Sequence, residues 1–265
     1  MRLKIHHVTR YRFDEPVTFA LQQVRKTPKN SHGQAVWDWQ TRVTGGTREL
    51  GFVDHHNNAC DLISYDRCST EVEIVSCGEV ELTDTQGIVG RHVGPAPLWL
   101  YTRASPRTEA RSGLREMMRG LERDDTLAML HALTVRIRAA VSYEIGASDP
   151  RWSAEEAMAA GRGVCQDHAH VFVAAARHLG LPARYVSGYL LLDDRTLQDA
   201  MHAWAEVHVD GLGWVGFDVS NGISPDHRYV RVATGLDYGD AAPVSGTRIG
   251  GSGEQLEVRI EVAQQ

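Results

Sequence analysis

A cysteine at the start of an expected helix is the residue of this chain best placed for covalent chemistry. Cys165 follows the flexible segment Gly-Arg-Gly (161–163) and opens an amphipathic helix over 165–179. Unpaired N–H groups and the positive end of a helix dipole stabilise a thiolate, which is the reactive form of cysteine. A cysteine at this place is also compatible with a purely structural role. The catalytic interpretation therefore needs a base and a group that orients the base.

His202 and Asp218 can supply that base and that carboxylate. They lie in HAWAEVHV (202–209) and GWVGFDVS (213–220), where strands are expected over 202–208 and 212–219. A three-residue loop over 209–211, with Gly211 in the left-handed conformation, predicts a register that places His202 opposite Asp218. Opposed residues share a face with Cβ atoms ~5 Å apart, within reach of a hydrogen bond. The alternatives are a histidine bonded to a carbonyl and an aspartate that caps the Ser-Asn-Gly turn.

An attack by Cys165 on a carbonyl would create an oxyanion that needs hydrogen-bond donors. The backbone N–H of Cys165, at the helix start, is expected to be one donor. Gln166, Tyr143 and Trp152 are candidates for the second donor, and packing is the alternative role of each. Asp167 is expected to cap the helix start.

Other side chains near these motifs suggest a substrate cleft, whereas they argue against a metal. Gln166, Trp204 and Tyr189 are candidates to line a cleft, and for the two aromatic residues a place in the core is the alternative. Helical spacing separates His168 from His170, and no second thiolate or carboxylate stands at ligand spacing. No metal and no cofactor is therefore expected, although the cysteine and histidines of this region could suggest one: Cys165, His168, His170, His202 and His208.

Four sequence blocks resemble the core of the bacterial transglutaminase-like superfamily, whose members are often described as candidate cysteine proteases. The blocks are GRGVCQDHAH, LPARYVSGY, HAWAEVHVDGLGW and FDVSNG, within residues 160–222. The resemblance implies Cys165 as nucleophile, His202 as general base and acid, and Asp218 as the orienting carboxylate. Val219-Ser220 in place of the commoner Pro-Thr, and His168 in place of an aromatic residue, depart from the family pattern and bear on substrate preference.

The likeness extends to both ends of the chain. The start, YRFDEPVTFALQQVRKTPK, and the DHHNN turn resemble the β-rich N-terminal domain that accompanies this core in bacteria. The tail, GLDYGDAAPVSG, resembles the closing segment that lies near the active site in the family. In bacteria such domains often accompany ligase-like proteins, so the resemblance also implies a peptide-ligase-type partner protein.

The pattern along the chain predicts two domains. Strand-like segments at 3–13, 35–43, 60–65, 69–76 and 79–84 predict a β-sandwich in residues 1–100. A connector near 86–104 and a helical region over 106–160 follow, then strands at 184–192, 202–208, 212–219 and QLEVRIEV near the end. The predicted fold class is α+β: residues 101–265 form a papain-like or transglutaminase core, in which the helix bearing the cysteine packs on an antiparallel sheet.

Composition limits the classes of partner that the protein is expected to bind. The 265 residues are 42% hydrophobic and 23% charged, with a net charge of −6 and no basic stripe, so we expect no nucleic-acid partner. No stretch approaches the ~18 apolar residues of a membrane span, and the first residues alternate, so the expected location is the cytoplasm with no membrane contact. Cys60, Cys68 and Cys77 have spacings typical of free thiols.

The sequence thus predicts a cysteine-dependent acyl-transfer enzyme that acts on a peptide or protein substrate. It would cleave a peptide or glutamine-type amide through a thioester, as a protease or amidase. The alternatives are a cross-linking transglutaminase and a catalytically idle peptide-binding module.

Overall fold

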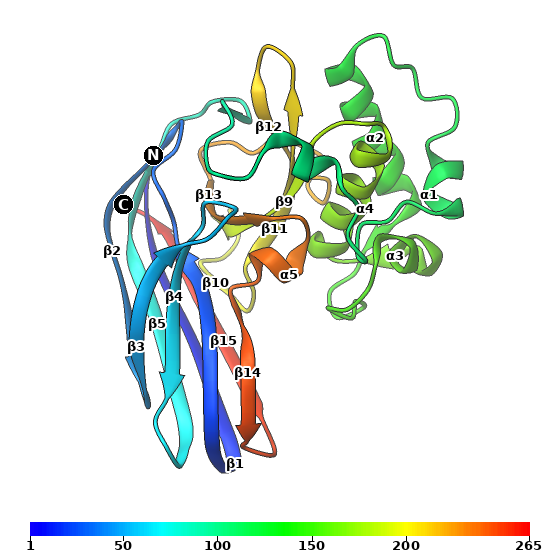
Figure 1. Ribbon diagram of the computed structural model, residues 1–265. Coiled ribbons are helices and arrows are strands. Elements are labelled where there is room, and N and C mark those ends of the chain that lie inside the picture. Colours follow the sequence, from blue (N-terminus) through cyan, green and yellow to red (C-terminus); the bar gives the residue numbers. More distant parts are fainter.

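The computed structural model describes residues 1–265, and its elements form three layers. Figure 1 shows a long N-terminal sheet on one side, a second sheet in the middle and the helices on the side away from the N-terminal sheet. All three layers belong to one packed unit, because buried side chains from both sheets share one apolar cluster. No helix is long and apolar enough to cross a bilayer.

The N-terminal sheet is organised by one strand of unusual length. β1 (Arg2–Thr27) pairs through residues 2–12 with β5 and β15, and through residues 17–27 mainly with β4 and β14. Hydrogen bonds therefore connect eight strands into one sheet, which includes strands from outside the predicted residues 1–100. Its remaining strands are β2 (Gln34–Thr44), β3 (Gly46–Val53), β4 (Ala59–Tyr65), β5 (Ser69–Leu82), β10 (Leu197–Gln198), β14 (Val244–Gly250) and β15 (Gln255–Gln264).

The expected division of the chain at residue 100 does not divide the sheets. β14 and β15 come from the end of the chain, yet both pair with β1, so that Leu3 lies opposite Gln264. Conversely β6 (Ile88–Gly90) precedes residue 100 but pairs with a strand of the middle sheet. The physical reason is that β1 offers backbone N–H and C=O groups along both of its edges. Strands from either half of the chain can pair with these groups.

The middle sheet is antiparallel, in the order β13-β9-β11-β12-β6. Its other strands are β9 (Ala183–Leu190), β11 (His202–Val209), β12 (Gly213–Phe217) and β13 (Tyr229–Gly235). Alternate residues of β11, including Ala205 and Val207, face a cluster of 23 buried side chains that the helices share. The intervening residues of β11 face the N-terminal sheet or the site described below.

The helices form the third layer. They are α1 (Ser112–Met117), α2 (Thr126–Ala140), α3 (Ala154–Ala160), α4 (Cys165–His178) and α5 (Tyr238–Ala241), with a 3₁₀ turn, η1, at Leu98–Thr102. Two have strong N-terminal caps: Asp125 accepts from two N–H groups of α2, and Ser153 and Glu156 form a reciprocal capping box on α3. α4 packs against β11 and β9, and this contact brings the start of α4 to the end of the middle sheet.

Candidate functional site

Cys165 is placed by a short chain of local constraints. α3 ends at Gly161 in the left-handed conformation (φ 63°), and Arg162–Gly163 form β8, which pairs in parallel with β7 (Ser142–Tyr143). A Cβ on Gly163 would lie 2.7 Å from the Cβ of Asp167, so glycine is required at this approach. Asp167 accepts a hydrogen bond from the N–H of Val164 (2.8 Å), and this side chain therefore anchors the helix start as the sequence suggested.

The hairpin that carries His202 and Asp218 differs in register from the prediction. β11 and β12 pair His208 with Trp214, whereas the predicted register is shifted from this one by two residues and is therefore wrong. The reason is that Gly213 also adopts the left-handed conformation (φ 80°), which moves the three-residue loop to 210–212. Because the shift is even, His202 and Asp218 still face the same side.

Asp218 is the group of the site whose hydrogen-bonding capacity is most fully used. Its side chain is inaccessible to solvent, and Oδ2 accepts hydrogen bonds from His202 Nε2 (2.6 Å), the Tyr229 hydroxyl (2.7 Å) and Asn221 Nδ2 (2.7 Å). Oδ1 accepts from the backbone N–H of Asn221 (3.2 Å). Burial alone would raise the pKa of Asp218, but these donors outweigh it and lower the pKa. The carboxylate thus orients His202 and caps the following turn at the same time.

His202 lies between the Asp218 carboxylate and Cys165. Burial lowers its pKa, but the charge of Cys165 and the hydrogen bonds to Asp218 and Cys165 more than reverse this and raise the pKa to about 10. Because Nε2 donates to Asp218, Nδ1 is the nitrogen left for the sulfur. The Trp204 ring stacks on the imidazole with centroids 6.2 Å apart. The arrangement therefore favours the imidazolium form of His202 beside Cys165.

Of the three candidates for a second oxyanion donor, Tyr143 is the one whose pKa responds to the site. Burial raises the pKa of its hydroxyl, and the negative charges of Cys165 and Asp218 raise it further, so the group is protonated. The Tyr143 ring is half exposed. By contrast Gln166 donates to the carbonyl of Pro150 (3.1 Å), and Trp152 packs against the helical core.

Three of the four histidines that could suggest a metal have partners separate from one another. His168 Nε2 donates to the carbonyl of Val141 (2.9 Å), and its Nδ1 accepts from the Ser220 hydroxyl (3.2 Å). Burial lowers the pKa of His168, which fits this neutral form. His170 is fully buried, where its Nε2 accepts from the N–H of Tyr238 (3.1 Å). His208 packs on the Trp214 ring. His168 and Ser220, the two departures from the family pattern, thus bind each other.

The predicted cleft residues behave differently from one another. The side chain of Tyr189 is inaccessible to solvent and contacts His7 and Trp39 where the two sheets meet, so it cannot line a cleft. Trp204 is also buried; it stacks on His202 and lines a pocket between the two sheets. Tyr189 therefore takes the core position given as its alternative, whereas Trp204 lines a pocket.

Sequence reasoning missed two partners of Asp218. Asn221 belongs to the Ser-Asn-Gly turn, and the expectation that Asp218 might cap this turn was the available signal. Tyr229 lies 11 residues beyond Asp218 and reaches it from β13 (2.7 Å). No spacing rule relates these two positions, because the connection between β12 and β13 is irregular.

Comparisons with known proteins agree with this architecture. Residues 114–219 match the family model described as the transglutaminase-like superfamily, and residues 3–81 match the bacterial transglutaminase-like N-terminal region. An uncharacterized protein of Mycobacterium leprae is 26% identical over an alignment of 282 positions. The alignment covers 99% of each chain. An uncharacterized protein of Mycobacterium tuberculosis is 38% identical over 128 residues, 44% of this chain and 41% of the relative.

A solved structure shows the same fold over the whole length. The crystal structure of a candidate cysteine protease from Cytophaga hutchinsonii superposes with a TM-score of 0.79 at 20% identity, covering 99% of this chain and 90% of that one. At this identity the likeness establishes the fold alone. The two family models show that the chain carries a core of the transglutaminase-like superfamily behind a bacterial transglutaminase-like N-terminal region.

Proposed function

We propose that the protein is a cysteine-dependent acyl-transfer enzyme that hydrolyses peptide or glutamine-type amides. The observation that carries the proposal is the position of His202, whose imidazole is hydrogen-bonded to the buried Asp218 and interacts with Cys165. A nucleophile, a base and a group that orients the base are the three parts that nucleophilic catalysis requires. Family membership supports a cysteine-dependent enzyme in general, and the reaction itself is our inference.

The proposed cycle has two halves. The Cys165 thiolate attacks the carbonyl carbon of the amide, and the His202 imidazolium gives its Nδ1 proton to the leaving amine as the C–N bond breaks. A thioester on Cys165 remains. Water then attacks the thioester while His202 accepts a proton from the water. The C–S bond breaks, the carboxylic acid is released, and the thiolate–imidazolium pair is regenerated. Asp218 keeps the imidazole in one orientation throughout, through the 2.6 Å bond to Nε2.

Two donors would stabilise the oxyanion of each tetrahedral intermediate. The N–H of Cys165 belongs to the first residue of α4 and has no acceptor within the helix. The Tyr143 hydroxyl is the second donor in this proposal, since the charge of Cys165 raises its pKa and the hydroxyl stays protonated. In the proposed papain-like arrangement, α4 supplies the nucleophile, the start of β11 supplies the base and the residue after β12 supplies the carboxylate. The cytoplasmic location stays a prediction from the sequence.

A covalent trapping experiment tests the proposal. The protein is mixed with a panel of activated esters and glutamine-containing peptides, and acyl adducts are located by mass spectrometry. We expect an adduct on Cys165 that decays in water and is absent from the His202→Ala variant, while Cys68→Ser, which changes an exposed thiol, leaves it unaltered. No adduct on Cys165 from any acyl donor, in a protein that remains folded, would favour the idle peptide-binding module.

The same experiment separates hydrolysis from cross-linking. Added methylamine competes with water for the thioester, and the ratio of amide product to acid product gives the partition directly. Hydrolysis predicts that acid remains the main product at millimolar amine. Quantitative conversion to the methylamide would instead identify a transglutaminase.

A further inference from the structure

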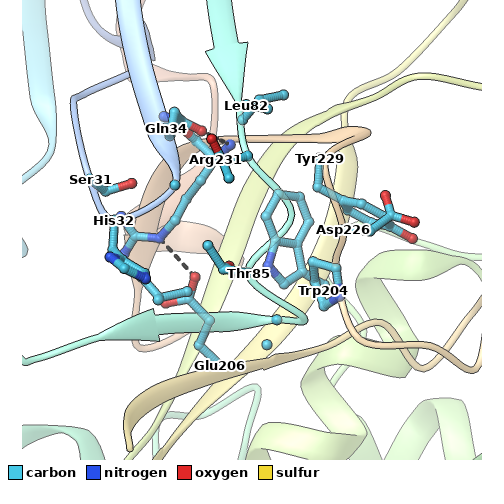
Figure 2. A pocket seen from close by; sticks show the side chains of 16 residues that line it. Ser31, His32, Gln34, Leu82, Thr85, Trp204, Glu206, Asp226, Tyr229 and Arg231 are labelled. Carbon is cyan, nitrogen blue, oxygen red and sulfur yellow. Dashed lines mark hydrogen bonds and ion pairs between the residues drawn. The ribbon is translucent and has the colours of Figure 1, made fainter. Parts of the chain in front are cut away.

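A small pocket lies where the N-terminal sheet meets the middle sheet. Its walls come from the 31–34 turn and the end of β5 on one side, and from β11, β12 and β13 on the other (Figure 2). The cavity volume is about 50 Å³, which is room for roughly four water molecules at about 10–15 Å³ each. A group of that size is a single carboxylate or another small polar group.

The charge at the base of the pocket is positive. Glu206 is completely buried and accepts hydrogen bonds from two guanidinium groups, Arg184 Nε (2.6 Å) and Arg231 Nε (2.7 Å). Burial raises the pKa of Glu206, but the two arginines outweigh it and lower the pKa, so the carboxylate is ionised. One carboxylate between two guanidinium groups leaves one uncompensated positive charge in a site of low dielectric constant.

Arg231 presents that charge to the pocket. Its Nε is engaged by Glu206, whereas Nη1 and Nη2 have no hydrogen-bond partner in the protein, and the side chain is 23% exposed. Figure 2 shows Arg231 and Glu206 side by side, with Thr85 next to them. The hydroxyls of Ser31, Thr83 and Thr85 line the same pocket and are likewise not used by other side chains. A set of free donors therefore surrounds the cavity.

The second carboxylate of the lining does not neutralise these donors. Asp226 is engaged by Arg228 through two nitrogens at 2.7 and 3.0 Å, and in Figure 2 it lies beyond Trp204 from Arg231. Gln34 is also occupied, because its side chain bonds both the N–H and the carbonyl of Arg231. The guanidinium of Arg231 is thus the arginine group of the lining that remains available to a ligand.

We propose that this pocket binds a carboxylate, received by the free Nη groups of Arg231 and the hydroxyl of Thr85. A planar guanidinium with two free nitrogens matches the two oxygens of a carboxylate, and such charge-assisted pairs are among the strongest hydrogen bonds in proteins. The carboxylate belongs either to a free small acid or to the carboxyl end of a peptide. The site is separate from Cys165, so the inference does not depend on the proposed function.

A ligand in the pocket would contact two residues that also contact the proposed triad. Tyr229 and Trp204 line the pocket and pack edge to face, with ring centroids 5.5 Å apart. Tyr229 donates to Asp218, and Trp204 stacks on His202.

Ligand-observed NMR titrations with acetate, at constant ionic strength set with chloride, test the site. We expect saturable acetate binding to the wild type, at least tenfold weaker binding to Arg231→Gln and at least threefold weaker binding to Thr85→Val. Thr85→Val removes a hydroxyl without changing charge, so it tests the site even if Arg231→Gln folds poorly. Arg42→Gln is the matched control, because it removes an exposed arginine of β2 that bonds only Gln40.

Further ligands identify the source of the carboxylate. N-acetylalanine that binds more tightly than acetate, while its amide does not bind, supports the carboxyl end of a peptide. Acetate binding that N-acetylalanine does not match supports a free small acid. Three results would overturn the carboxylate site. They are the absence of saturable binding of both acids, binding of acetate to Arg231→Gln and Thr85→Val as tight as to the wild type, and a preference for inorganic phosphate.

Discussion

Replacing Lys26 with methionine is expected to stabilise the protein at neutral and acidic pH. Lys26 is 1% exposed, and its ammonium donates to the Thr9 hydroxyl without any carboxylate partner. Thr9 bonds His7 (3.1 Å), and His7 bonds Tyr189 (3.0 Å), so the chain of polar groups leads from β1 to the middle sheet. A buried cation with only neutral partners is costly, whereas methionine has a similar shape and no charge.

The magnitude follows from the pKa of the lysine. Burial lowers the pKa of Lys26 from 10.5 to about 7. At about 1.4 kcal/mol for each pH unit, that difference costs the folded protein roughly 5 kcal/mol when the lysine is charged in both states. Loss of the hydrogen bond to Thr9 offsets about 2 kcal/mol of the gain. We therefore expect Lys26→Met to raise the free energy of unfolding at pH 6 by roughly 3 kcal/mol.

The pH dependence has a definite sign. Between pH 7 and pH 10.5 the unfolded chain holds the lysine proton and the folded protein releases it, so this group makes the wild type more stable as pH rises. Below about pH 7 both states are protonated and the full cost remains. The advantage of the methionine variant should thus shrink by about 3 kcal/mol between pH 6 and pH 9.5.

Urea unfolding at pH 6 and pH 9.5 measures both effects. Lys29→Met is the matched control, because Lys29 lies three residues along the chain and donates to Asn57 (2.7 Å) in a less buried setting. A Lys26→Met variant that is less stable than the wild type at pH 6, or whose advantage does not change with pH, would refute the reasoning. The first result would mean that the polar chain stabilises the junction of the sheets.

Three further predictions concern the site and the thiols. Tyr229→Phe removes the 2.7 Å donor to Asp218, and iodoacetamide labelling of the nucleophile at pH 6 should slow by about tenfold, since a hydrogen bond to a charged group contributes about 1.5–3 kcal/mol. Tyr143→Phe removes the proposed oxyanion donor, and kcat for an activated ester should fall by roughly 10²-fold with little change in KM. Burial raises the pKa of Cys60, so at pH 8 its labelling in the folded protein should be slower than that of the exposed Cys68.

Each of these has a contradicting result. Labelling of Tyr229→Phe as fast as that of Tyr65→Phe, a tyrosine buried in the N-terminal sheet, would remove the hydroxyl of Tyr229 from the account. A change confined to KM in Tyr143→Phe would point to substrate binding. Equal labelling of the two cysteines would mean that the N-terminal sheet opens readily around Cys60.

Local spacing explains which parts of the site were predictable. The sequence placed Cys165 at a helix start because the glycines before it and the apolar positions after it are close in the chain. It placed His202 and Asp218 on one face because any even shift of a hairpin preserves the face. The register itself depended on the conformation of Gly213, where a Cβ would lie 2.1 Å from the carbonyl oxygen of Gly90. That contact comes from a strand far away in the sequence.

Contacts between segments far apart in the chain explain the features that the sequence did not predict. β14 and β15 join β1 across more than 200 residues, and no pattern within either segment names its partner. The same holds for Tyr229, which reaches Asp218 only because β13 lies at the edge of the middle sheet beside β9. Composition and periodicity predicted strands at these ends, but which edge each strand covers is decided by the packed molecule.

The most direct test of the central claim is the pH profile of iodoacetamide labelling, with each cysteine followed by mass spectrometry in the wild type and in His202→Ala. The account predicts fast labelling of Cys165 below pH 7 in the wild type, reduced at least tenfold in the variant, because His202 stays protonated up to a pKa of about 10 and supports the thiolate. Labelling of Cys165 in the wild type that is no faster than that of the exposed Cys68 at every pH would contradict it.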